Sequence, residues 1–271
     1  MRLHRLCFLI LPLFLAIPAY ADSILGTAVN FGVLGASTVT NTGPTVIING
    51  SLGVSPGTAI TNTAGITING VSYAGNTTVP NDAGSAAAQA DALTAYNALA
   101  AMAVTENLTG QNLGGLTLTP GVYKFDSDAG LTGVLTLNFE GLNNAEIIFQ
   151  IGSALTTATG SSIVIENPGS NDGLFWDVGS SATLGTTTAF EGNILAVASI
   201  TMNTDATIGC GSALALNGAV TMDNNTIATG CNGGGGTGGD TTSPVPEPES
   251  MTLFGSGLIA LVGFVRRRIN L

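Results

Sequence analysis

The sequence predicts a mainly β fold, an irregular right-handed β-solenoid, and three observations support this. Glycine accounts for 38 of the 271 residues, about twice its usual share, so the chain makes many tight turns. Threonine, serine, asparagine and valine outnumber strong helix formers over most of the chain, which disfavours a helical bundle. Short strand patterns also recur about every twenty residues, the period of a solenoid coil.

The repeats show where the strands lie. Four segments each contain an apolar strand, a corner of small residues and a second short strand that opens with threonine. These second strands begin at Thr156, Thr183, Thr201 and Thr221, which are 27, 18 and 20 residues apart (183−156, 201−183, 221−201), and 58–61 is an earlier copy. The unequal spacing favours an irregular solenoid over a strictly periodic one. From the repeats alone, a β-sandwich remains the alternative.

One segment breaks the repeat. Residues 81–105 are rich in alanine, with an apolar stripe at helical spacing formed by Leu93, Tyr96, Leu99, Ala100 and Ala103. We expect one helix at about 82–105, capped by Asp82 or Ser85. Its stripe should cover a flank of the solenoid. A helix that recruits a partner is the disfavoured alternative, because that flank would then stay bare.

The start of the chain has the features of a secretory signal peptide. Basic residues in 1–5 precede the apolar run 6–17, and Ala19-Tyr20-Ala21 forms a small-x-small cleavage site. We expect signal peptidase to remove residues 1–21. A transmembrane anchor is the alternative, which the short run disfavours.

The end of the chain has a second targeting pattern. A Gly/Thr-rich linker, 232–244, precedes Pro246, Glu247 and Pro248, the apolar stretch 251–265 and the cluster Arg266, Arg267 and Arg268. Residues 245–271 closely resemble the PEP-CTERM sorting signal of exopolysaccharide-producing Gram-negative bacteria. The resemblance implies transient membrane anchoring, processing by an exosortase, and a final place at the cell surface or outside the cell. A plain C-terminal anchor in the inner membrane is the alternative.

The cysteines fit an exported protein. Removal of the signal peptide removes Cys7 and leaves Cys210 and Cys231. Each follows a Thr-Ile element, one repeat apart. Since exported proteins favour disulfides, we expect these two cysteines to pair.

The charges exclude several functions. Residues 22–244 contain one lysine, no arginine and no histidine, and the whole chain carries a net charge of −11. Nucleic-acid binding, His-dependent nucleophilic catalysis and His-ligated zinc are therefore excluded. The acids are scattered; the densest group, Asp126 and Asp128 beside Lys124, should face solvent or cap a corner. We expect no metal, no cofactor and no enzymatic activity.

The recurring threonines define a candidate binding face. If Leu184, Met202 and Met222 point inward, alternation turns their neighbours outward onto one flat surface with few charges. Methyl groups restrict water there and hydroxyls anchor it, which suits the ordering of water. The predicted face comprises Thr58, Thr61, Thr156, Ala158, Thr183, Gly185, Thr201, Asn203, Thr221 and Asp223.

Residues 24–231 resemble the DUF3494-type family of ice-binding proteins. The matching stretches are 25–31, 52–58, Ala95-Tyr96, 113–123, 149–153, 179–185 and 217–221. The resemblance implies a discontinuous solenoid with three faces, of which one binds ice, and a helix alongside. The family's Thr-Ala/Gly-x-Thr/Asn pattern is complete only at 58–61. Asp205 and Asp223 near the face argue against hyperactive ice binding.

We therefore expect an exported, monomeric protein that adsorbs to ice and inhibits ice growth or recrystallisation. The alternative is a structural or adhesive protein of the extracellular matrix that binds exopolysaccharide, which the sorting signal suggests. A polysaccharide-active enzyme is disfavoured because arginine, histidine and clustered acids are missing from residues 22–244.

Overall fold

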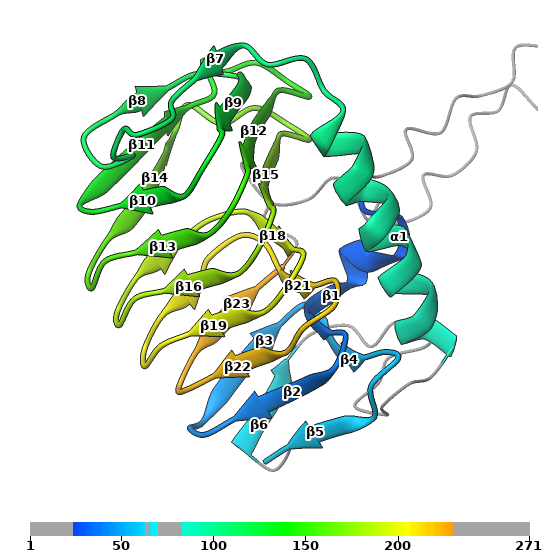
Figure 1. The fold of residues 1–271 in the computed structure, drawn as a ribbon. Coiled ribbons are helices and arrows are strands. Elements are labelled where there is room, and N and C mark those ends of the chain that lie inside the picture. Colours follow the sequence, from blue (N-terminus) through cyan, green and yellow to red (C-terminus); the bar gives the residue numbers. More distant parts are fainter. Residues whose placement is uncertain (1–23, 63–64, 70–82, 230–271) are drawn as a thin grey trace, which may run out of the picture.

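The computed structural model describes residues 24–62, 65–69 and 83–229. Three parallel β-sheets form the sides of a solenoid, and one long helix lies along one side (Figure 1). This confirms the predicted irregular solenoid of three faces. The predicted signal peptide, linker, sorting segment and Cys231 lie outside the described residues.

Each sheet takes one strand from each successive coil. Sheet A contains, in spatial order, β4 (Ser51–Val54), β1 (Phe31–Gly35), β21 (Ala213–Ala215), β18 (Asn193–Ala196), β15 (Gly173–Val178), β12 (Glu146–Ile151), β9 (Gly121–Phe125) and β7 (Glu106–Asn107). Sheet B contains β10 (Ala129–Leu131), β13 (Leu155–Thr157), β16 (Ala182–Leu184), β19 (Ile200–Met202), β22 (Val220–Met222), β2 (Thr38–Asn41) and β5 (Ala59–Thr61). Sheet C contains β6 (Ile66–Asn69), β3 (Thr45–Ile48), β23 (Thr226–Ala228), β20 (Thr207–Ile208), β17 (Ala189–Phe190), β14 (Ser162–Glu166), β11 (Val134–Asn138) and β8 (Thr117–Leu118).

The coils do not stack in sequence order. The first coil, β1 to β3, packs between the second coil, β4 to β6, and the last coil, β21 to β23. After the second coil the chain reaches the far end of the stack through the helix and then returns coil by coil (Figure 1). The first and last coils of the described chain are therefore neighbours in the stack, and we call the junction between them the seam.

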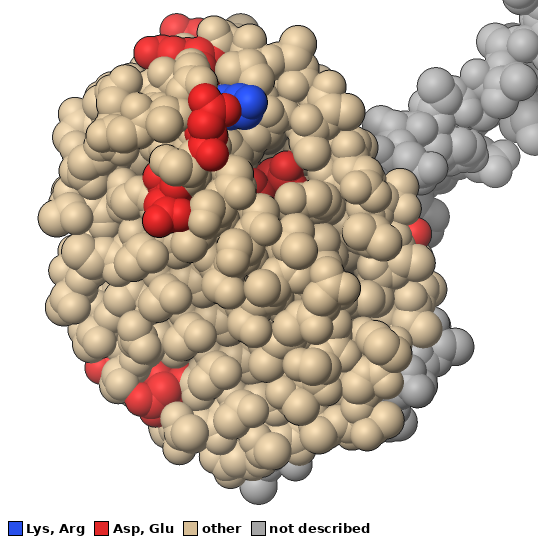
Figure 2. Space-filling model, viewed as in Figure 1, with Lys and Arg blue, Asp and Glu red and all other residues tan. Residues whose placement is uncertain are grey.

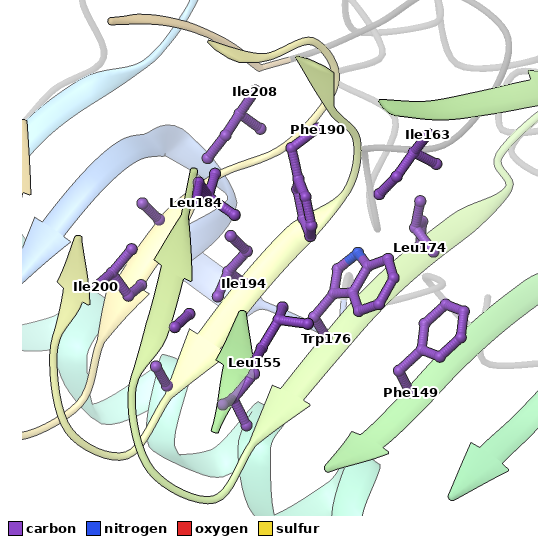
Figure 3. Packing of buried hydrophobic residues seen from close by; sticks show 14 of the residues in the cluster. Phe149, Leu155, Ile163, Leu174, Trp176, Leu184, Phe190, Ile194, Ile200 and Ile208 are labelled. Atoms are coloured by element: carbon purple, nitrogen blue, oxygen red, sulfur yellow. The ribbon is translucent and has the colours of Figure 1, made fainter. Parts of the chain in front are cut away.

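The core tapers along the stack. At its wide end, the inward side chains of sheet A are aromatic. The ring centroids of Phe149 and Trp176 are 3.9 Å apart and nearly parallel, and Phe190 of sheet C lies 4.9 Å from Trp176 (Figure 3). In the same register the next coils carry Ile194 and then Ala213. The sheet A strands shorten in the same direction, from six residues in β12 and β15 to four in β18 and three in β21.

Helix α1 (Ala83–Ala100) packs on the outer side of sheet A, through a stripe that shares only Leu99 and Tyr96 with the one predicted. Its buried residues are Ser85, Ala88, Ala92, Ala95 and Leu99, whereas Leu93 is 50% exposed and Ala100 and Ala103 are also exposed. Alanine allows the helix to approach the sheet closely, so the small residues rather than the large ones form the interface. Tyr96 is half-buried, Ser85 lies inside the helix, and Asp82 lies outside the described residues.

Three side chains fix the helix to the solenoid. Gln89 Nε2 donates to the carbonyl oxygens of Ala215 and Leu216, and Gln150 Nε2 donates to those of Leu99 and Met102 at the end of the helix. Asp91 accepts hydrogen bonds from Thr27, in the short 3-10 helix η1 (Gly26–Asn30). Within the described residues, no helix is both long and apolar enough to cross a membrane.

Candidate functional site

An unbroken column of threonines runs along the outer surface of sheet B. Strand alternation produces it: in β16, β19 and β22 the residues on either side of the threonine are buried. The parallel register then aligns one threonine per coil over six strands, at about 4.8 Å spacing. In spatial order, this threonine column consists of Thr61, Thr40, Thr221, Thr201, Thr183 and Thr156.

A second set of positions borders the threonine column where sheet B turns toward sheet C. Each lies two residues after the threonine of its coil, and together we call them the corner column: Thr42, Asp223, Asn203, Gly185 and Ala158. The carboxylate of Asp223 accepts a hydrogen bond from the Thr204 hydroxyl of the neighbouring coil. Amide, hydroxyl and methyl groups therefore lie beside the threonines, with one carboxylate among them.

The structure brings most of the predicted face together and corrects it at two positions. Thr58 precedes strand β5 and does not lie in the threonine column. Gly185 lies in the corner column but is buried, because the chain passes so close to the previous coil that an added Cβ would lie 2.6 Å from the carbonyl oxygen of Thr157. The remaining predicted residues occupy the threonine and corner columns.

Sequence reasoning missed Thr40, which completes the column between Thr221 and Thr61. The alternation Thr38-Val39-Thr40, with Val39 buried, is the signal that could have identified it. Thr40 was overlooked because it belongs to the first coil, and the four aligned repeats all lie in the second half of the chain.

Charge is sparse over the centre of this face. Figure 2 shows acidic atoms near its edges and a broad uncharged surface between them. Lys124 is the only basic residue among those described. Its Nζ lies 2.8 Å from Asp126 Oδ1, and this contact together with hydrogen bonds from Asn107 and Thr109 lowers the pKa of Asp126. Asp128 accepts a hydrogen bond from the amide of Ala154, so both acids bridge coils at corners, as predicted.

The other two sheets offer no comparable surface. Helix α1 covers the outside of sheet A. The outward positions of sheet C form a mixed series: Thr67, Val46, Thr226, Thr207, Ala189, Ser162 and Val134. Sheet C also carries the exposed acid Glu166 on β14. Sheet B is therefore the one with both an open surface and a continuous threonine column.

Within the described residues, no three histidine, cysteine, aspartate or glutamate side chains lie together in a group that could hold a metal ion. Cys210 is disulfide-bonded. Since Cys231 lies outside the described residues, its pairing with Cys210 stays a prediction.

Comparison with known proteins gives a consistent result. An ice-binding protein of Nostoc sp. (strain HG1) is 53% identical over 253 residues, covering 93% of this chain and 90% of that protein. The crystal structure of an ice-binding protein from an Antarctic biological consortium aligns with a TM-score of 0.69 and 43% identity, covering 76% of this chain and 90% of the other. That of an ice-binding protein from Antarctomyces psychrotrophicus aligns with a TM-score of 0.67 and 40% identity, covering 77% and 98%.

Two family models also match. The PEP-CTERM protein-sorting motif matches residues 244–268, which confirms the sorting signal predicted from the sequence. The ice-binding-like family matches residues 33–228, nearly the whole described solenoid. The chain therefore belongs to the ice-binding-like family.

Proposed function

We propose that this protein adsorbs to ice through the threonine column and corner column of sheet B, and thereby inhibits ice growth or recrystallisation. The observation that carries the proposal is the unbroken column of six threonines on an open sheet. Methyl groups restrict the first layer of water, while hydroxyl groups anchor it at regular points. Such a surface holds ice through many weak contacts made at once.

The proposed activity has no chemical step. The described residues contain no histidine or arginine, and the acids Asp126 and Asp128 are engaged in bonds between coils. The family and the relatives support ice binding and give no support to the matrix-protein hypothesis. We therefore assign no catalytic residue and no cofactor.

Export accompanies this function. The PEP-CTERM motif indicates export and sorting at a membrane. We propose that signal peptidase removes residues 1–21, that an exosortase of a Gram-negative cell cuts near Pro246, Glu247 and Pro248, and that the monomeric solenoid then acts outside the cell. Contact with exopolysaccharide would follow from that location.

A pair of matched double variants tests the proposal. Thr201→Tyr/Thr221→Tyr places two bulky rings on adjacent coils of sheet B, and Thr207→Tyr/Thr226→Tyr makes the same change on adjacent coils of sheet C. All four threonines are half-buried, so the two variants perturb the fold to a similar extent. We expect the sheet B variant to lose ice recrystallisation inhibition and ice-crystal shaping while the sheet C variant keeps both. Equal activity in the two folded variants would refute the assigned face.

A further inference from the structure

Beneath the corner between sheets B and C lies a set of buried polar side chains that the proposed ice contact does not use. Thr157, Thr188 and Asn225 are 3%, 0% and 1% exposed. Inward polar groups in a solenoid core cost free energy unless they are hydrogen-bonded, so a specific role is expected of them. Each one binds the backbone of residues in the corner column.

The two threonines form a continuous chain of hydrogen bonds between two coils. The amide of Gly185 donates to Thr157 Oγ1 at 2.8 Å, and Thr188 Oγ1 donates to the carbonyl oxygen of Ala158 at 3.3 Å. The two hydroxyl oxygens lie 2.8 Å apart. Because the single hydroxyl proton of Thr188 goes to Ala158, Thr157 donates to Thr188. Gly185 and Ala158, adjacent members of the corner column, are thereby connected.

Asn225 does the same for the next pair of coils. Its Oδ1 accepts the amide of Asp223 at 2.7 Å, and its Nδ2 donates to the carbonyl oxygen of Asn203 at 2.9 Å. The same Nδ2 also donates to the carbonyl oxygen of Ala206 at 2.9 Å. Asp223 and Asn203 are the corner-column residues of adjacent coils, so a third buried side chain connects a second pair.

These side-chain bonds supplement the backbone ladder at the end of sheet B. Strands β13, β16, β19 and β22 each have only three residues, with the threonine at the centre. Just after these strands, the amides of Ala158 and Asn203 still donate to carbonyl oxygens of the neighbouring coil. The amides of Gly185 and Asp223 instead donate to Thr157 Oγ1 and Asn225 Oδ1. Without the buried side chains these two amides would lose their partners, and the corner column would be less tightly held relative to the threonine column.

We propose that Thr157, Thr188 and Asn225 are positioning residues of the ice-binding face. They do not touch ice; they fix the spacing of the corner column and keep it level with the threonine column. The inference rests on the proposed function of sheet B. It predicts that removal of a buried hydroxyl weakens ice binding at temperatures where the protein remains fully folded.

The test uses isosteric variants and a matched control. Thr188→Val removes the hydroxyl and keeps the shape, and Thr188→Ser restores a hydroxyl. Thr157→Val is a second removal in the same hydrogen-bond chain. The control is Ser212→Ala at the corner between sheets C and A, where Ser212 is 1% exposed and its Oγ donates to Asn193 Oδ1 at 2.9 Å. Circular dichroism and thermal unfolding first establish that each variant is folded and how far its stability falls.

Ice recrystallisation inhibition is then measured well below the unfolding temperature. We expect both valine variants to need a roughly tenfold higher concentration, because a site loosened by about 1 Å loses much of its function. Thr188→Ser should recover most of the activity, and Ser212→Ala should keep the wild-type value despite a comparable loss of stability.

Three results would overturn the inference: full activity in the valine variants, an equal loss in Ser212→Ala, or failure of both valine variants to fold, which would assign the hydroxyls to the fold itself. An inactive but folded wild-type protein would instead contradict the proposed function, so the two failures are distinguishable.

Discussion

Thr40 and Thr221 are register partners in parallel strands β2 and β22, although one belongs to the first coil and the other to the last. The threonine column crosses the seam of the solenoid at this pair. Next to it, Thr42 Oγ1 donates to the carbonyl oxygen of Met222 at 3.2 Å, and the amide of Asn225 donates to Thr45 Oγ1 at 3.2 Å. The proposed binding face is thus continuous in space and interrupted in sequence.

Thr40→Tyr should therefore impair ice binding even though Thr40 lies in the N-terminal coils. A tyrosine ring at this position would stand above the column between Thr221 and Thr61 and keep ice away from both. We expect a marked loss of recrystallisation inhibition. Thr67→Tyr, on the exposed outer side of sheet C in the same part of the stack, is the control and should remain active. Full activity of Thr40→Tyr would restrict the face to the C-terminal coils.

Asp223 is expected to limit the activity of the face. It places a carboxylate in the corner column beside the uncharged Asn203, and charge orients water differently from an amide or a hydroxyl. Asp223→Asn should lower the concentration needed to inhibit recrystallisation. Asp205→Asn removes the same charge from an exposed turn beyond the corner column and should leave the activity unchanged. Weaker activity in Asp223→Asn would mean that the carboxylate contributes to binding.

The aromatic stack should dominate the stability of the wide end of the core. Trp176 is fully buried between Phe149 and Phe190, and its Nε1 donates to the carbonyl oxygen of Glu191 at 2.9 Å. Trp176→Ala should lower the free energy of unfolding by about 3–5 kcal/mol. Leu93→Ala, at the exposed helix position, should change it by no more than about 0.5 kcal/mol. Denaturant unfolding measures both, and a large effect at Leu93 would support the helix stripe predicted from the sequence.

Stability should also depend on the ionisation of Asp177, which lies under helix α1 and is 3% exposed. Burial raises its pKa from 3.8 to about 7. Between these two pKa values, the Asp177 carboxyl is therefore protonated in the folded protein and ionised in the unfolded chain. The contribution of Asp177 to stability is greatest below the unfolded pKa of about 4, falls as pH rises toward 7, and levels off above it.

Asp177→Asn tests this pH dependence. Unfolding free energies measured from pH 4 to pH 8 should show a smaller fall in the variant than in the wild-type protein. Burial also raises the pKa values of Glu146 and Glu191, so the variant should retain part of the slope. Identical slopes in the two proteins would show that Asp177 is not protonated under the helix.

The sequence predicted the solenoid and its inward residues well because each signal was local. Alternation alone places Leu184, Met202 and Met222 in the core, and all three are buried. Repeats of similar composition then indicate stacking without any knowledge of distant contacts. The same logic identified Thr156, Thr183, Thr201 and Thr221.

What the sequence did not reveal depends on contacts between distant segments. The first coil stacks on the last coil through the register of strands β2 and β22, and this register places Thr40 in the column. The buried helix stripe follows from how closely Ala88, Ala92 and Ala95 approach sheet A, whereas hydropathy favoured Leu93. The burial of Gly185 likewise reflects the neighbouring coil and not its own alternation.

Direct adsorption to ice tests the central claim most directly. The purified wild-type protein and the Thr201→Tyr/Thr221→Tyr variant, each labelled with a fluorophore, would be offered to a slowly growing ice hemisphere. We predict that the wild-type protein is concentrated in the ice and that the folded variant stays in the liquid. A folded wild-type protein that stays in the liquid, or equal uptake of both proteins, would contradict the account.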